Sequence, residues 1–207
     1  EVPNFSSVPN LKTLYLNDNQ LSGEIPDFSN ISLHELYLND NQLSGEIPDF
    51  NDISLYDLYL DGNQLSGSIP SFSNLPNLST LSLTNNQLSG EVPNFDNVPN
   101  LVNLYLSGNE LSGEIPNLPN LFRLDLSNNQ LTGVFPANLN NLNNLILLDL
   151  SNNQLSGSIP ALDSLINLNV FKICPNNLTG NIPSFNASTN LNIGDIDYSC
   201  VIAAQTT

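Results

Sequence analysis

The 207-residue chain has very little positive charge. It contains 3 lysine and arginine residues against 20 aspartate and glutamate residues, which gives a formal net charge of −17. Nucleic acids and anionic membranes are bound through clustered basic side chains, so this composition argues against both classes of partner. The negative charge favours a basic protein or cations as partners. The alternative is that the protein has no charged partner and the acidity only keeps a repetitive surface soluble.

Imidazole side chains, which commonly act as catalytic bases and metal ligands, are almost absent. His34 is the single histidine, and the chain has no methionine or tryptophan. One imidazole excludes metal sites built on two histidines and leaves a single candidate for a histidine base. No glycine-rich phosphate loop and no GxSxG motif is present. We therefore predict that the protein is not an enzyme and that it needs neither a cofactor nor a metal ion.

Long apolar runs are absent, and cysteines are few. No run reaches the roughly 18 apolar residues of a membrane-spanning helix, so we expect no direct membrane insertion. The two cysteines, Cys174 and Cys200, are fewer than the four ligands of a usual zinc site. They suit one disulfide in an oxidising compartment, which favours an extracellular or cell-surface location. The alternative is a pair of reduced, buried thiols in a cytosolic protein.

A single phrase, LxxLxLxxNxLSGxIP, returns every 20 to 24 residues along the chain. Its copies begin at Leu11, Leu33, Leu55, Leu78, Leu101, Leu121, Leu145 and Leu168. Such a period indicates a solenoid of stacked units. We predict one domain over residues 1–207, with a partial repeat at 1–10 and eight full repeats at 11–190. Residues 191–207 would form a further partial repeat and a C-terminal cap.

Each position of the repeat has a structural interpretation. The leucines of LxxLxL alternate with polar residues or tyrosine, which indicates a strand with one buried face. Such short strands bury this face only by stacking into a parallel sheet. The asparagine at the ninth position can donate to and accept from the backbone of adjacent turns, which predicts a ladder. Its members would be Asn19, Asn41, Asn63, Asn86, Asn109, Asn129, Asn153 and Asn176.

The second half of each repeat is predicted to form the return path. The glycine of LSG supplies a tight bend, and the following proline disfavours a helix before it. Two residues later come Phe28, Phe50, Phe72, Phe95 and Phe185, or the leucines Leu118 and Leu162. We expect these side chains to stack as an apolar spine in the core. The segments that follow are too short for an α-helix and should be 3-10 turns or extended chain.

These motifs resemble the leucine-rich-repeat superfamily over Val2 to Cys200. The LSGEIP and LSGSIP phrases are similar to its plant-type subclass, which includes receptor-kinase ectodomains and polygalacturonase-inhibiting proteins, although several units are shorter. The resemblance implies a right-handed, curved solenoid of the mostly β α/β class. It would have a parallel concave sheet and 3-10 or extended convex segments.

The two ends of the predicted solenoid differ. Cys174 occupies position seven of its repeat and Cys200 position ten of the next, so a disulfide between them is geometrically reasonable. It would close the C-terminal end of the array. No matching cap is recognisable at the N-terminus, which suggests either a fragment of a longer chain or an end covered by another domain or by self-association with a second subunit.

The central residue of each predicted strand should point outward on the concave face. Four of these eight positions are tyrosine, the full set being Tyr15, Tyr37, Tyr59, Ser82, Tyr105, Asp125, Asp149 and Lys172. Exposed tyrosine is an amphipathic contact group that suits protein and sugar ligands. The alternative is that tyrosine occurs here only because it is favoured in β-strands and covers the sheet. The predicted ligand-binding residues are Tyr15, Tyr37, Tyr59, Tyr105, Glu35, Asp57, Arg123, Asp125 and Asp149.

The sequence supports three hypotheses for function. The first is a non-catalytic recognition module that binds a protein, peptide or glycan on the concave face. The second is a structural spacer, adhesion or self-assembly segment of a larger surface protein, suggested by the near-identical copies of LYLNDNQLSGEIPDF. The third is binding of ice or mineral by regularly stacked side chains.

Overall fold

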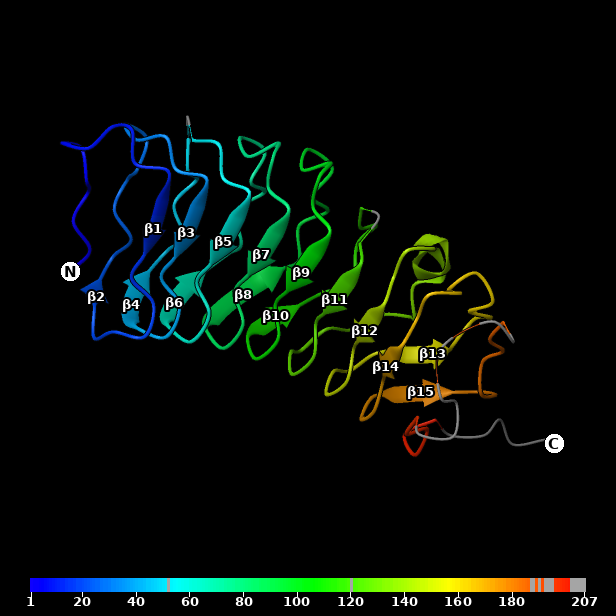
Figure 1. Cartoon of the computed structure of the whole chain (residues 1–207). Coiled ribbons are helices and arrows are strands. Elements are labelled where there is room, and N and C mark those ends of the chain that lie inside the picture. The colour runs from blue at the N-terminus through cyan, green and yellow to red at the C-terminus, as the bar shows by residue number, and fades with distance from the viewer. Residues whose placement is uncertain (52, 120, 187–188, 190, 192–195, 202–207) are drawn as a thin grey trace.

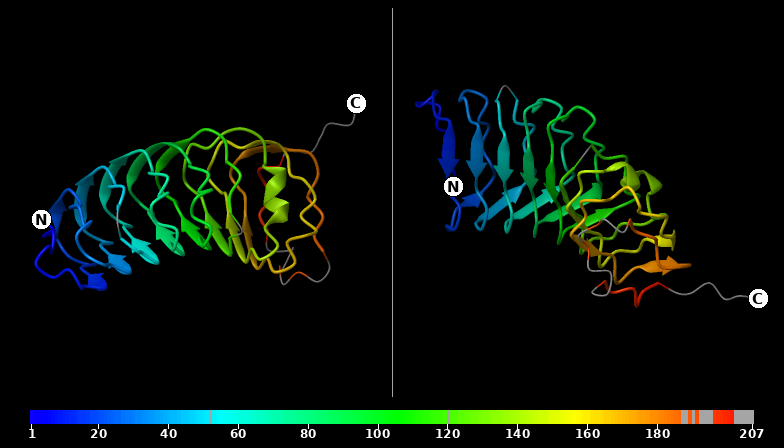
Figure 2. Two further views of the ribbon diagram at one scale, coloured as in Figure 1. Left: turned by 90° about the horizontal axis from the view of Figure 1, so that it is seen from above. Right: turned by 45° about the vertical axis from the view of Figure 1, so that its right-hand side comes forward.

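The computed structural model describes residues 1–51, 53–119, 121–186, 189, 191 and 196–201. The chain winds into successive coils that stack side by side along one axis (Figure 1). Seen from above, the stack bends into an arc (Figure 2). The mostly β, curved solenoid expected from the repeats is therefore confirmed.

One parallel sheet of eight strands runs the length of the solenoid and receives one strand from each coil. Its strands, in spatial order, are β1 (Thr13–Tyr15), β3 (Glu35–Tyr37), β5 (Asp57–Tyr59), β7 (Thr80–Ser82), β9 (Asn103–Tyr105), β11 (Arg123–Asp125), β12 (Leu147–Asp149) and β14 (Val170–Lys172). The register pairs equivalent positions, so that Leu14 lies beside Leu36 and Leu36 beside Leu58. These leucines are buried, which places the alternate side chains on the outside.

A second set of strands is formed by the QLSG phrase of the repeats and its equivalents. Five of them form one sheet, namely β2 (Ser22–Gly23), β4 (Gln42–Gly45), β6 (Gln64–Gly67), β8 (Gln87–Glu91) and β10 (Glu110–Ser112). Strands β13 (Ser156–Ser158) and β15 (Asn177–Thr179) form a separate pair. The sequence predicted only a bend here. The glycines do take positive φ, as at Gly45 with φ 86°, but the residues around them also pair with the next coil.

The asparagine ladder is confirmed for all predicted members except Asn19, whose side chain donates only to the Leu16 and Asn17 carbonyl oxygens of its own coil. The Asn63 amide donates to the carbonyl oxygen of Leu38 in the preceding coil at 3.0 Å and to that of Leu60 in its own coil at 3.1 Å. Its side-chain oxygen accepts from the Leu43 amide at 2.9 Å. Equivalent bonds are made by Asn41, Asn86, Asn109, Asn129, Asn153 and Asn176. Each asparagine thus joins two coils and satisfies backbone groups that the turn leaves unpaired.

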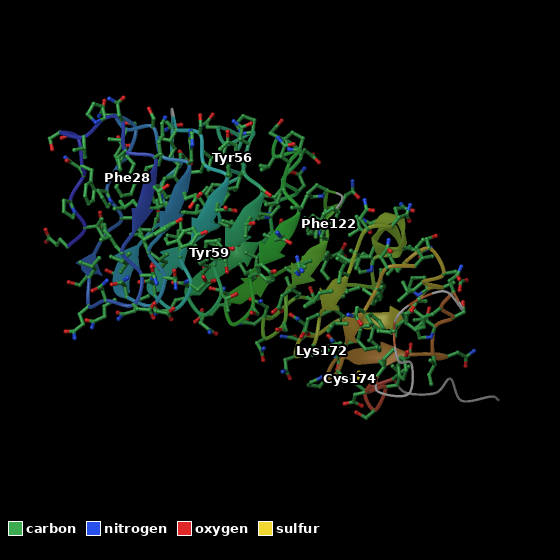
Figure 3. The ribbon with its side chains drawn as sticks, viewed as in Figure 1. Phe28, Tyr56, Tyr59, Phe122, Lys172 and Cys174 are labelled. Atoms are coloured by element: carbon green, nitrogen blue, oxygen red, sulfur yellow. A yellow bond between two sulfur atoms is a disulfide. The ribbon has the colours of Figure 1, made fainter. Side chains whose placement is uncertain are left out.

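The apolar spine is confirmed for most of its predicted members. Phe28, Phe50, Phe72 and Phe95 are almost fully buried, and Figure 3 labels Phe28 within the first coils. Phe185 corrects the prediction, because it is only partly buried. It packs edge-on against Phe171, with ring centroids 5.6 Å apart, since it lies in the last full coil.

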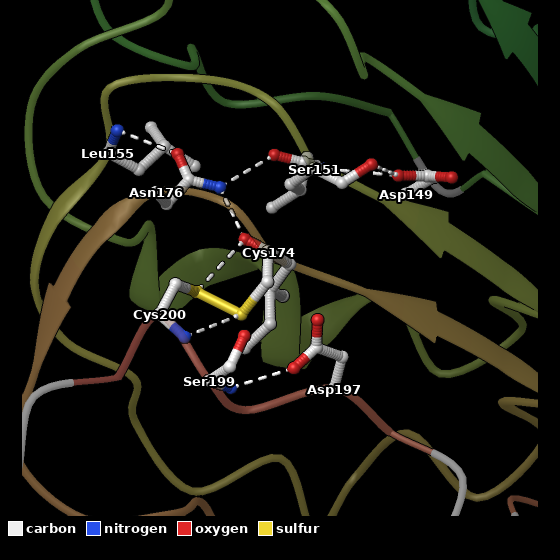
Figure 4. Close-up of a disulfide and its surroundings, with 10 residues drawn as sticks. Asp149, Ser151, Leu155, Cys174, Asn176, Asp197, Ser199 and Cys200 are labelled. Carbon is white, nitrogen blue, oxygen red and sulfur yellow. Dashed lines mark hydrogen bonds between the residues drawn. A yellow bond between two sulfur atoms is a disulfide. The ribbon is translucent and has the colours of Figure 1, made fainter.

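The return segments also follow the prediction. Within the described residues they are extended or turn-like, apart from a 3-10 helix, η1 (Ala137–Asn141), in the longest repeat. The predicted disulfide joins Cys174 to Cys200 and is shown in Figure 4. The partial repeat and cap predicted at 191–207 lie largely outside the described residues. Their described part, Leu191 and 196–201, contains no strand.

Candidate functional site

Three tyrosines form a continuous row on the outer face of the eight-stranded sheet, which we call the strand face. Tyr15, Tyr37 and Tyr59 are direct neighbours in the register of β1, β3 and β5. Their ring centroids are 4.5 Å apart between the first two residues and 4.6 Å apart between the last two. Tyr15 is 54% exposed, whereas the other two are half-buried. Ser82 then separates this row from Tyr105.

Two carboxylates accompany the tyrosine row. Glu35 and Asp57 begin β3 and β5 and lie side by side in the register, on the same face as the tyrosines. The Tyr15 hydroxyl donates a hydrogen bond to the Glu35 carboxylate. This bond raises the pKa of Tyr15 to about 12, with smaller contributions from desolvation and nearby charge. The sheet register therefore brings the predicted tyrosines and acids of the N-terminal half together.

The other tyrosines of the site are also held in their neutral form. Burial raises the pKa of Tyr37, and the Asp57 carboxylate adds to this shift. Burial is likewise the main cause of the raised pKa of Tyr59. It raises the pKa of Tyr105 too, although the positive charge of Arg123 partly offsets this. At neutral pH all of these side chains are phenols, so they can offer hydroxyl donors beside the carboxylates.

The C-terminal half of the strand face is less open than the sequence suggested. Asp149 is only 7% exposed, which corrects its prediction as an accessible ligand-binding acid. Its Oδ1 accepts hydrogen bonds from the Ser151 amide at 3.0 Å and hydroxyl at 2.6 Å. Its Oδ2 lies 3.2 Å from the Lys172 Nζ. The predicted acid is therefore already paired within the fold.

Arg123 and Asp125 keep their predicted place on the strand face through β11. Both side chains are half-buried. The Arg123 guanidinium donates to the Asn103 side-chain oxygen at 3.2 Å, and Asp125 accepts from the Ser127 amide at 3.0 Å. These contacts orient the side chains but leave part of each in contact with solvent.

A second aromatic pair lies next to the tyrosine row and was not among the predicted binding residues. His34 and Tyr56 immediately precede β3 and β5, and their ring centroids are 5.1 Å apart. Tyr56 is 45% exposed and appears in Figure 3 above Tyr59. Their shared second position in successive repeats is the sequence signal that identifies them as neighbours.

The described part of the chain offers no assembled metal centre. Within it, no group of three or more histidine, cysteine, aspartate or glutamate side chains is placed to hold a metal ion. Nor does this part include a helix of the length and apolar character needed to cross a bilayer. The strand face brings aromatic, hydroxyl and carboxylate groups together at Tyr15, Tyr37, Tyr59, Glu35 and Asp57.

Comparison with solved structures gives three informative similarities. The crystal structure of a TDR receptor is 33% identical over 86% of this chain and 33% of its own, with a TM-score of 0.77. The Arabidopsis receptor kinase HAESA, in complex with the peptide hormone IDA and the co-receptor SERK1, is 38% identical over 84% of this chain and 31% of its own, with a TM-score of 0.74. This chain thus spans about a third of the length of these receptor chains.

A plant ice-binding protein is 27% identical over 99% of this chain and 80% of its own, with a TM-score of 0.65. Comparison with curated protein sequences gives no significant match. Family models described as leucine-rich repeats match residues 9–52, 54–75, 77–96, 100–119, 120–142 and 144–165. The repeated strands, the asparagine ladder and these matches agree, and the chain belongs to the leucine-rich-repeat family.

Proposed function

We propose that this chain is an extracellular, non-catalytic recognition module that binds a peptide or a protein segment on its strand face. The observation that carries the proposal is the stacked row of Tyr15, Tyr37 and Tyr59 beside Glu35 and Asp57. The similarity to receptor structures, one of them in complex with a peptide hormone, supports the same class of ligand. The disulfide and the similarity to receptor chains support an extracellular location.

The tyrosine row provides contact area with little loss of conformational entropy. Each ring already packs against its neighbour, so a ligand would meet side chains that are largely ordered beforehand. Tyrosine combines an apolar ring with a hydroxyl group and is common in binding surfaces for this reason. The row therefore suits an extended segment that crosses several strands.

The adjacent acids define the charge of the proposed ligand. The Glu35 and Asp57 side chains lie on the same face as the row, and the whole chain carries a formal charge of −17. A segment with lysine or arginine near the tyrosine contacts would be attracted both at long range and at the site. An acidic segment would be repelled.

The test is selection of linear peptides from a random displayed library, followed by affinity measurement with synthetic copies of the enriched sequences. We expect enriched peptides to contain basic and apolar residues, and the Tyr37→Ala/Tyr59→Ala double variant to bind them at least about tenfold more weakly. Glu35→Gln should weaken binding and reduce its salt dependence. The control variants are Val134→Ala and Glu114→Gln, which change exposed side chains away from the strand face.

Unchanged affinity in the double variant would place the ligand elsewhere. A library without any enrichment would instead favour the structural alternative, in which the array acts as a spacer or adhesion segment.

Adsorption to ice is a second candidate, favoured by a similarity in structure and by a feature of the repeat. The plant ice-binding protein aligns with 99% of this chain and is itself covered over 80% of its length. A hydroxyl residue also recurs directly before the glycine of each LSG or LTG phrase, at Ser22, Ser44, Ser66, Ser89, Ser112, Thr132, Ser156 and Thr179. Thermal hysteresis of the purified chain would support this candidate, and a freezing point equal to the melting point would exclude it.

A further inference from the structure

A depression lies at the edge of the strand face, where β11, β12 and β14 begin. It has a volume of about 350 Å³ and is lined by Phe122, Asn144, Ile146, Asn167 and Asn169. Phe122 is 40% exposed, and Figure 3 labels it at the start of β11. The volume falls within the range of small-molecule sites in proteins. We call this depression the Phe122 pocket.

The Phe122 pocket is built on backbone that is fixed from coil to coil. The Ile146 amide donates to the Phe122 carbonyl oxygen at 2.8 Å, and the Asn169 amide donates to the Ile146 carbonyl oxygen at 2.8 Å. The Asn167 side chain donates to the Asn143 carbonyl oxygen at 2.9 Å and so joins the return segments of two coils. The spacing of the lining residues is therefore set by the fold before any ligand arrives.

Two of the amides in the pocket have no partner within the described part of the chain. Asn167 is engaged with the neighbouring coil, whereas the side chains of Asn144 and Asn169 are exposed and make no hydrogen bond there. Each primary amide offers two donors and one acceptor oxygen. The pocket thus combines an apolar floor from Phe122 and Ile146 with unengaged neutral donors and acceptors, and no lining side chain is charged.

We propose that the Phe122 pocket binds a neutral saccharide unit. A pyranose ring has a face of polarised C–H groups, which fits the electron-rich face of the Phe122 ring. Its rim carries hydroxyls that both donate and accept, as do the amides of Asn144 and Asn169. An apolar side chain would cover these amides without giving them partners, which carries a desolvation penalty. An anionic sugar would meet no lining cation and the chain's net charge of −17.

This site is separate from the tyrosine row. The row involves β1, β3 and β5, whereas the Phe122 pocket involves the starts of β11, β12 and β14. The inference therefore does not rest on the proposed peptide function, and each can fail without the other. Where both hold, the two sites would contact different parts of a ligand or two different ligands.

The experiment is saturation-transfer NMR and calorimetric titration of the full chain with cellotriose, xylotriose, maltotriose, mannotriose, galactotriose and chitotriose. We expect at least one of these neutral oligosaccharides to bind with a dissociation constant of roughly millimolar or lower, as is reasonable for a small open site. Phe122→Ala should weaken this binding by at least about tenfold, and Asn169→Leu should also weaken it.

Val134→Ala is the matched control, because it shortens an exposed apolar side chain outside the pocket. It should bind the same saccharide as the unmodified chain does. The Tyr37→Ala/Tyr59→Ala double variant should also retain saccharide binding, which separates this site from the peptide site. Since Phe122 is exposed, circular dichroism should show its alanine variant folded. Absence of binding by every oligosaccharide, or binding unaffected by Phe122→Ala, would overturn the proposal.

Discussion

Asp61 is a carboxylate that the fold partly removes from water. It follows β5, and its Oδ1 accepts hydrogen bonds from the Ser82 hydroxyl and, at 3.1 Å, from the Thr84 amide. Desolvation raises the pKa of Asp61, while these two hydrogen bonds lower it in part. Because the folded chain holds this proton more tightly than the unfolded chain, Asp61 contributes less stability as the pH rises through its titration range.

Asp61→Asn should therefore increase the free energy of unfolding at neutral pH. The asparagine oxygen can still accept from Ser82 and Thr84, and the charge that burial disfavours is gone. We expect a gain of about 0.5 to 1 kcal/mol at pH 7 that shrinks toward about pH 4, measured by urea unfolding. Asp49→Asn, at an exposed position, is the control and should show a smaller change. A loss of stability at pH 7 would mean that the hydrogen bonds outweigh the desolvation.

At the scale of single elements, the asparagine ladder links each coil to the one before it. Asn86 is 9% exposed and donates to Leu60 in the preceding coil and to Leu83 in its own, both through carbonyl oxygens. It also accepts from the Leu65 amide at 3.0 Å. Asn19 is exposed, and its side chain donates only to carbonyl oxygens of its own coil. The same residue type therefore has different structural importance at the two positions.

Asn86→Ala should cost about 2 to 4 kcal/mol of unfolding free energy, since it leaves several buried backbone groups without partners. Asn19→Ala should cost less than about 1 kcal/mol, because water can reach the groups it leaves. Chemical denaturation of both variants under the same conditions provides the comparison. Equal losses of unfolding free energy in the two variants would show that the hydrogen bonds between coils add no stability beyond that of the bonds within the turn.

The glycines that end the repeated LSG or LTG phrase have an additional packing role. Gly133 has φ +84°, and a Cβ added there would lie 2.7 Å from the Glu114 Cγ of the preceding coil. Gly90 has the same φ of +84°, but its nearest neighbour would be the Ser68 Cβ at 3.8 Å. An alanine at either position is strained by the left-handed backbone, whereas only Gly133 also lacks space.

Gly90→Ala should cost about 1 to 2 kcal/mol from backbone strain alone. Gly133→Ala should cost about 1 kcal/mol more, because the Glu114 side chain must move. Adding Glu114→Ala should remove this difference, which thermal or urea unfolding of the single and double variants can measure. If the difference persisted without the Glu114 side chain, steric contact would not be its cause.

Local patterns in the sequence predicted these elements to different degrees. The leucine strands and the asparagine ladder were predictable because the same residue type recurs at the same position of each repeat. At each of these positions the side chain has a single physical role. The second set of strands was not, because LSG alone indicates a turn and its pairing exists only once the neighbouring coil is present. The left-handed position before the ladder asparagine, as at Asp40 and Asn85, was also missed. Aspartate, asparagine and glycine tolerate this conformation, and all occur there.

The candidate site was predicted only in part for a similar reason. The register of a parallel sheet follows from the repeat, so the row of Tyr15, Tyr37 and Tyr59 could be placed from spacing alone. Burial depends on neighbours in other coils. Asp149 occupies the equivalent position to Tyr59, yet Ser151 and Lys172 bond to it and cover it. Its accessibility therefore depends on Lys172 of the next coil as well as on Ser151 of its own repeat.

For the molecule as a whole, the strand order shows how stability is distributed. In the eight-stranded sheet each strand pairs only with strands of adjacent coils. The stabilising interactions of this sheet are therefore made between neighbouring coils along the axis. A disruption should therefore have its largest effect nearby. The Cys174–Cys200 disulfide lies at the C-terminal end and spans 26 residues of sequence. The Cys200 amide also donates to the Cys174 Sγ at 3.3 Å (Figure 4).

The Cys174→Ser/Cys200→Ser double variant should lose stability mainly in the C-terminal coils. Closing a loop of 26 residues stabilises a fold by about 3 kcal/mol in the chain-entropy model. Hydrogen exchange followed by mass spectrometry should show faster exchange in β14 and β15 and unchanged protection in β3 and β5. The reduced unmodified chain serves as the control and should reproduce the pattern. Equal acceleration in β3 and β14 would instead show that the coils unfold as one cooperative unit, because loss of the C-terminal crosslink would then be transmitted along the whole axis.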